Sequence, residues 1–172
     1  VNRICRAGVA LLFACVLTQG AEYYVDVESC GGKADDAGPG SLGKPWRTLN
    51  RVVSDQQPSP GPGDTVWIRG GVYKESMRLL KGGAPGRPLS LRAFRDETPI
   101  VDGEGKRRNG IVFAAEGTAD HVLLEGVTLR NFAPRGVAVS VTNRTGVTIR
   151  KVNVSGVRIG VWLTRCTDCR LL

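Results

Sequence analysis

The sequence predicts an all-β protein, a parallel β-helix in which short strands stack turn upon turn. Residues 122–131 (VLLEGVTLRN) match residues 147–156 (VTIRKVNVSG) at an offset of 25, and a third copy begins at Thr167. Within both long copies apolar residues alternate with polar ones, which is typical of strands that bury one face. Self-similarity at this spacing indicates a solenoid, whose units bury their apolar faces against their neighbours. A β-sandwich is the alternative, but its strands rarely keep one internal pattern.

The matching copies also predict which residues stack. Strands of neighbouring turns lie about 4.8 Å apart, so residues at matching positions form columns. Val122, Val147 and Cys169 then share an interior column, and Glu125 lies beside Arg150 on the outer face.

A second match concerns the segment that carries Trp162. Residues 136–141 match residues 160–165 at an offset of 24, which places Trp162 in the column of Ala138. Trp162 is out of phase with its apolar neighbours along the chain, so we expect its side chain to point outward.

The first 21 residues are predicted to be a signal peptide. They combine a basic start, an apolar run too short to span a membrane and small residues before a polar stretch. The expected domain, residues 22–172, is then secreted, periplasmic or at the cell surface, and no other segment is apolar enough to be a transmembrane helix. About 150 residues suffice for one hydrophobic core.

The first third of this domain reads as a cap followed by early strands. Residues 22–27 form a first strand, and residues 28–43 a loop rich in glycine and aspartate. Pro45 begins a short amphipathic helix with Trp46, Leu49, Val52 and Val53 on one face, which can lie across the open end of the first turn. A turn at 56–64 follows, and the next strands are expected at 65–69, 89–94, 99–103 and 110–115.

Charge and cysteine content limit the classes of ligand and cofactor that this domain is expected to bind. Outside the leader 22 basic residues stand against 16 acidic ones, scattered among strands and turns. Such a surface favours acidic polysaccharides as ligands, whereas the leader and the absence of a binding motif argue against nucleic acid. Cys166 and Cys169 have the spacing of half a zinc site, but no second pair exists and His121 is the single histidine. We therefore expect no metal there. The two cysteines are expected to be corner or interior residues, and they could form a disulfide in an oxidising compartment.

Several segments resemble a known group of proteins. They are Tyr23–Asp26, Lys44–Leu49, Pro62–Tyr73 and Ile100–Gly105, together with the loop rich in glycine and serine that separates the first two. The series is similar to the opening of secreted right-handed parallel β-helix proteins of the pectate-lyase-like superfamily, which includes lyases of pectate, alginate and chondroitin. The resemblance covers residues 22–172 and implies a right-handed helix with an N-terminal cap. It also implies carbohydrate processing outside the cytoplasm, although fold alone does not establish activity.

A lyase of this kind would cleave a uronate-containing polysaccharide by β-elimination. It needs a cation, either Ca²⁺ or basic side chains, to stabilise the carboxylate, and a base to remove the neighbouring proton. No calcium-binding column is evident, so a calcium requirement stays open. Asp102 and Glu104 read as a turn. In the resembled lyases the catalytic groups lie on middle turns, and this chain reads as the first part of a longer protein, so no catalytic residue is assigned.

The substrate-binding candidates are outward or corner residues of the clear turns. Basic side chains there can pair with uronate carboxylates, and an exposed indole can stack on a sugar ring. These candidates are Arg130, Arg150, Lys151, Trp162 and Arg165. Two other classes of function remain open, a non-catalytic glycan-binding or adhesin-like module and a glycoside hydrolase, which would need paired carboxylates.

Overall fold

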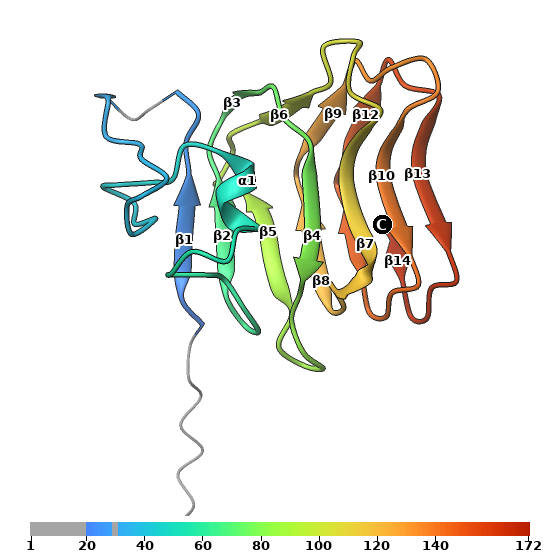
Figure 1. The fold of residues 1–172 in the computed structure, drawn as a ribbon, viewed down its shortest axis with the longest axis horizontal. Coiled ribbons are helices and arrows are strands. Elements are labelled where there is room, and N and C mark those ends of the chain that lie inside the picture. The colour runs from blue at the N-terminus through green and yellow to red at the C-terminus, as the bar shows by residue number, and fades with distance from the viewer. Residues whose placement is uncertain (1–19, 29–30) are drawn as a thin grey trace, which may run out of the picture.

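Three parallel sheets wind around one apolar core, and they account for nearly all of the regular structure (Figure 1). The structure is a computed structural model that describes residues 20–28 and 31–172. Most of the predicted leader, and Cys30, lie outside the described residues. Within the described part of the chain, no helix is long and apolar enough to cross a membrane.

Each full turn contributes one strand to each sheet. Sheet A consists of β1 (Glu22–Val25), β2 (Thr65–Ile68), β5 (Leu89–Ala93), β8 (Val122–Glu125), β11 (Thr148–Arg150) and β14 (Arg170–Leu171). Sheet B consists of β4 (Met77–Lys81), β7 (Asn109–Thr118), β10 (Val137–Thr142) and β13 (Ile159–Thr164). Sheet C consists of β3 (Gly71–Tyr73), β6 (Pro99–Asp102), β9 (Thr128–Arg130) and β12 (Asn153–Ser155).

The strand register confirms the predicted columns of sheets A and C. Leu129 pairs with Val154, and the pairing of Leu123 with Thr148 sets Val147 directly beside Val122. Val122 and Val147 are both buried, as alternation predicted. Glu125 pairs with Arg150, and their side chains form an ion pair of 2.9 Å on the outer face.

The predicted register of Trp162 is wrong by two residues. Trp162 pairs with Ser140, an offset of 22, rather than with Ala138. Six residues separate β9 from β10, whereas three separate β12 from β13, so the corner of the later turn is shorter. The glycines used for the match are not equivalent, because Gly136 lies in a corner and Gly160 lies within β13. The side chain of Trp162 nevertheless points outward and is 49 % exposed.

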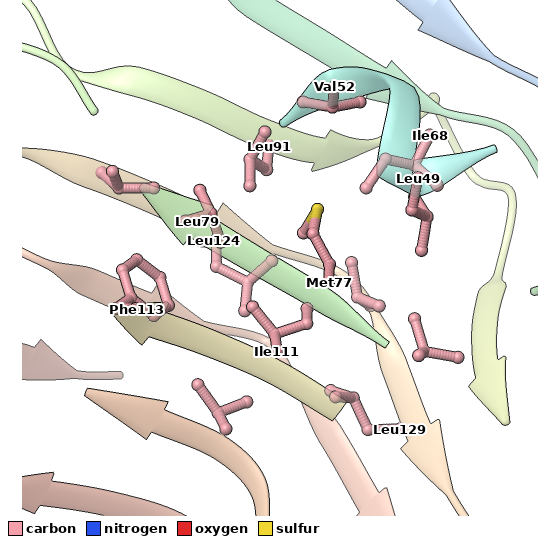
Figure 2. Close-up of a cluster of buried hydrophobic side chains, with 14 of the residues drawn as sticks. Leu49, Val52, Ile68, Met77, Leu79, Leu91, Ile111, Phe113, Leu124 and Leu129 are labelled. Atoms are coloured by element: carbon pink, nitrogen blue, oxygen red, sulfur yellow. The ribbon is translucent and has the colours of Figure 1, made fainter. Parts of the chain in front are cut away.

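The interior is filled by side chains from all three sheets and from the helix α1 (Leu49–Val52) (Figure 2). Phe113 of sheet B, Leu124 of sheet A and Leu129 of sheet C are fully buried there. Cys166 and Cys169 are free thiols that pack at the edge of this core, which agrees with their interpretation as interior or corner residues. Burial raises the pKa of the Cys169 thiol.

The predicted helix is shorter than its apolar pattern suggested. Trp46 is not helical: its backbone pairs with β1 through hydrogen bonds to Tyr24 and Asp26, and its ring stacks on Tyr23 at 4.9 Å. The helix begins after Thr48, whose hydroxyl accepts from the backbone N–H of Arg51. The carboxylate of Glu75 accepts from the first two backbone N–H groups, and these contacts stabilise the short helix.

Candidate functional site

The outer face of sheet A carries a row of aromatic and charged side chains, one from each turn. The strand register stacks Tyr24, Trp67, Arg92, Glu125 and Arg150 in this order. Each of them alternates along its strand with a buried apolar residue, which is why it faces outward. At about 4.8 Å per turn, the row runs roughly 19 Å along the long axis of the molecule.

A groove of about 470 Å³ follows the first part of this row. One side is aromatic and the other is charged. It is lined by Glu22, Tyr24, Trp67, Arg92, Ala93, Phe94, Arg95, Glu125, Gly126 and Lys151.

The aromatic side of the groove is held by Glu22. Its carboxylate accepts from Trp67 Nε1 at 3.1 Å and from the Tyr24 hydroxyl at 3.0 Å. Both rings meet Phe94 edge to face, Tyr24 at 5.7 Å and Trp67 at 6.1 Å between centroids. Burial, and then the hydrogen bond to Glu22, raise the pKa of Tyr24, so its hydroxyl stays protonated at neutral pH. This cluster forms a wall with fixed ring orientations.

The charged side is organised around Glu125, which is 8 % exposed. One of its oxygens accepts from Arg92 Nε at 2.7 Å and from Arg150 at 2.9 Å. Burial disfavours the ionised carboxylate, but the hydrogen bonds and charges of the two guanidiniums outweigh this, so the pKa of Glu125 is lowered. Arg92 also lies 5.2 Å from the centre of the Trp67 ring and joins the two sides of the groove.

Lys151 completes the groove at its open edge. It is exposed and has a left-handed backbone, with φ of 51°, at the corner after β11. Beside it in the previous turn is Gly126, which also has a positive φ and has no side chain to fill the space. Among the described residues no hydrogen bond or ion pair occupies the Lys151 ammonium, so it can pair with an anionic ligand.

The five predicted binding residues do not form one surface. Lys151 lines the groove on sheet A, and Arg150 lies beside the groove on the same sheet. Arg130 ends β9 in sheet C, and its Nε donates to Asp102 at 2.8 Å. Trp162 lies on the outer face of sheet B, and Arg165 is exposed at the corner after β13.

Trp67 and Arg92 are the groove residues that sequence reasoning missed. The alternation of residues 65–69 places the Trp67 side chain on the outer face of sheet A. In the structure its neighbours are Glu22 of β1, Arg92 of β5 and Phe94, and its ring lines the groove. The signal was the alternation within residues 65–69 and 89–94, but the irregular spacing of the first turns hid which residues stack.

The arrangement suits recognition better than acid–base chemistry by carboxylates. Both carboxylates of the groove are already engaged by donors, Glu22 by the aromatic wall and Glu125 by two arginines. Asp102 is the last residue of β6 and is likewise held by Arg130, Asn131 and the backbone of Glu104, which begins the turn after that strand. In residues 20–28 and 31–172, no three His, Cys, Asp or Glu side chains are grouped to hold a metal ion.

Comparison with known proteins connects this chain to carbohydrate-active β-helices. No protein-family model matches it. A pectate lyase of Emericella nidulans is 34 % identical over 97 residues, which is 55 % of this chain and 21 % of the lyase. The uncharacterized protein YwoF of Bacillus subtilis is 32 % identical over 69 residues, 40 % of this chain and 14 % of that protein. The matched stretches thus span a small part of either relative.

Two solved structures share the architecture. A rhamnogalacturonan lyase superposes with a TM-score of 0.56 and 17 % identity, over 88 % of this chain and 51 % of the lyase. A lacto-N-biosidase of Eubacterium ramulus gives 0.56 and 13 % identity, over 88 % of this chain and 40 % of the enzyme. The chain has a pectate-lyase-like β-helix fold. At these identities the superpositions show the fold alone, and function rests on the groove and on the sequence relative.

Proposed function

We propose that this chain is part of a secreted polysaccharide lyase that cleaves an acidic polysaccharide by β-elimination, and that the groove on sheet A holds sugar residues of its substrate. The observation that carries the proposal is the pairing of an aromatic wall with a free lysine in one groove of a β-helix. The similarity to a pectate lyase supports it. Secretion rests on the predicted leader, and we assign the loop and helix over residues 31–53 as the N-terminal cap.

The groove offers complementary contacts to a uronate. A sugar ring presents apolar C–H groups that can pack on the Trp67 ring. Lys151, Arg92 and Arg95 can then pair with its carboxylate. A neutral glycan would leave the lysine without a partner, so acidic chains bind more tightly.

A lyase fits the groove better than a hydrolase. A glycosidase needs one carboxyl group that stays protonated to act as an acid, yet the pKa of Glu125 is lowered and Glu22 is held by two donors. β-Elimination instead requires positive charge near the substrate carboxylate, which this surface supplies. The second candidate, a non-catalytic glycan-binding module, is favoured by the same engagement of both carboxylates.

The full-length protein that contains this chain should bind polygalacturonate and release unsaturated products, seen as rising ultraviolet absorbance from the new double bond. We expect Lys151→Ala to weaken binding by about fivefold, because an exposed charge-assisted contact contributes on the order of 1 kcal/mol. Lys106→Ala removes an exposed lysine outside the groove and is the matched control. Isothermal titration with polygalacturonate and with a neutral glucan measures both effects.

The outcomes separate the two candidates. Binding without absorbance change supports the module, and absorbance change with binding supports the lyase. Equal affinity for the neutral glucan, or equal losses in both lysine variants, would rule out the groove as the site.

Trp162 offers a separate test of glycan contact on sheet B. It stacks outward beside Ser140, Val112 and Arg78. Because half of the indole is exposed, Trp162→Ala should leave the melting temperature nearly unchanged while weakening polygalacturonate binding by a few fold. A melting temperature lowered by several degrees with unchanged affinity would make Trp162 a packing residue.

A further inference from the structure

A second depression lies on the outer face of sheet A, at the start of its later strands. It encloses about 340 Å³ and is lined by the turns that contain β8, β11 and β14 and by Ala84, Gly86 and Pro88 of the loop before β5. Its floor is the outward column of Leu123, Thr148 and Arg170, which stack one above another. The depression therefore lies on the same sheet as the groove, displaced toward the other end of the strands.

His121 forms the rim of this second depression. It has a left-handed backbone at the corner before β8, as do Gly146 and Asp168 at the matching corners of the next two turns. A side chain at Gly146 would collide with the His121 imidazole, so the glycine lets that ring lie against the next turn. Asp120 fixes the corner by accepting from the Thr145 backbone at 2.7 Å. The histidine lines the second depression together with Arg170 and Thr148.

The two depressions adjoin at the Glu125–Arg150 pair. Glu125 lines the groove, Arg150 lines the second depression, and their side chains are joined at 2.9 Å. The two outward columns are two residues apart along each strand, a separation of about 7 Å. One ligand can therefore pass from the groove over this pair into the second depression.

The combined surface carries more positive than negative charge. It has five basic and three acidic side chains: Arg92, Arg95, Arg150, Lys151 and Arg170 against Glu22, Glu125 and Asp168. The three acids are engaged, because Asp168 pairs with Arg170 at 3.1 Å and the other two hold the groove together. A ligand with carboxylates along its length meets this pattern.

We infer that a single acidic polysaccharide chain runs obliquely across sheet A and occupies both depressions. The inference rests on the proposed function and extends it: the preferred ligand is an extended oligomer of uronates rather than one or two sugars. Trp67 and Lys151 bind one end, and His121 and Arg170 bind the other. Contacts at two linked subsites add, so affinity should rise with ligand length until both are filled.

The test is a titration with galacturonate oligomers of increasing length. We expect Trp67→Ala to weaken binding of every oligomer, and Arg170→Ala to weaken binding of long oligomers by about three- to tenfold while short ones are unaffected. Arg158→Ala, an exposed arginine outside both depressions, is the matched control. His121→Ala should have the same effect as Arg170→Ala: weaker binding of long oligomers and unchanged binding of short ones. Circular dichroism verifies that each variant is folded.

Failure of the inference differs from failure of the proposed function. If affinity does not depend on length, or if Arg170→Ala and Arg158→Ala behave alike with long oligomers, the second depression is not a subsite while the groove stands. If no acidic oligomer of any length binds, both are overturned.

Discussion

Replacing Phe113 with alanine should lower the free energy of unfolding by about 3–5 kcal/mol, the range typical of removing a buried phenylalanine. Its ring is fully buried among the core side chains (Figure 2). In the strand register of sheet B it lies between Leu79 and Val141 of the neighbouring turns. A close-packed interior cannot collapse around so large a loss, so a cavity remains. Because domains are stable by only about 5–15 kcal/mol, this one change removes a large share of the total.

Urea denaturation followed by circular dichroism measures this effect. Val112→Ala is the matched control, because Val112 precedes Phe113 on the same strand and lies in the outward column with Ser140 and Arg78. We expect the control to cost less than about 1 kcal/mol. Similar losses at both positions would contradict the alternation on which the fold assignment depends.

The sequence alone predicted the later turns well because three signals agreed there. Alternation assigned the inward side chains, the offset of 25 assigned the register, and the opposite charges of Glu125 and Arg150 suited neighbouring outward positions. Each signal is local or compares two nearby segments, so no knowledge of distant contacts was needed.

The earlier turns were harder to predict because their strands are short and unevenly spaced. The strands β3 and β4 were missed. Sheet A residues recur at an offset of 25 from β2 to β5 but 33 from β5 to β8, since the long strand β7 and the corner after it insert residues. Aligning one turn of the sequence with the next fails when the number of residues per turn changes. The corner before β13 caused the register error of Trp162 for the same reason.

The predicted helix was too long because an apolar face at helical spacing does not show where a helix starts. Trp46 fits that face, yet its backbone hydrogen bonds to β1, and Arg51 lies 4.4 Å over its ring. Backbone contacts with residues twenty or more positions away decided the conformation of Trp46. Such contacts cannot be read from local periodicity.

The candidate site shows the same division between local and distant information. Arg150 and Lys151 could be placed on the outer face from alternation. Their partners could not, because Trp67 comes from a turn some eighty residues earlier and joins them only through the stacking of sheet A. Basic residues at similar outward positions, such as Arg130, were equally good candidates from sequence, but Arg130 lies on sheet C, away from the groove.

The Glu125 carboxylate is a structural part of the groove, and its removal should show a distinctive pH dependence. We expect Glu125→Gln to lower the free energy of unfolding by about 1–3 kcal/mol at pH 7, less than for a fully buried pair because both guanidiniums reach water. The folded pKa of Glu125 lies below its unfolded value of about 4.3. Its contribution is therefore complete above that value and is lost as the pH falls through the folded pKa.

The difference between wild type and Glu125→Gln should thus be constant from pH 7 down to about pH 5 and should shrink below about pH 4, as the wild-type carboxyl becomes protonated. Glu116→Gln is the matched control: Glu116 pairs with Arg78 on an exposed face, so we expect a change of less than about 1 kcal/mol. Urea unfolding from pH 3 to pH 7 measures both. A difference that stays constant through pH 3 would mean that the Glu125 charge does not hold the two arginines in place. In that case the order of the groove would come from the aromatic wall around Trp67.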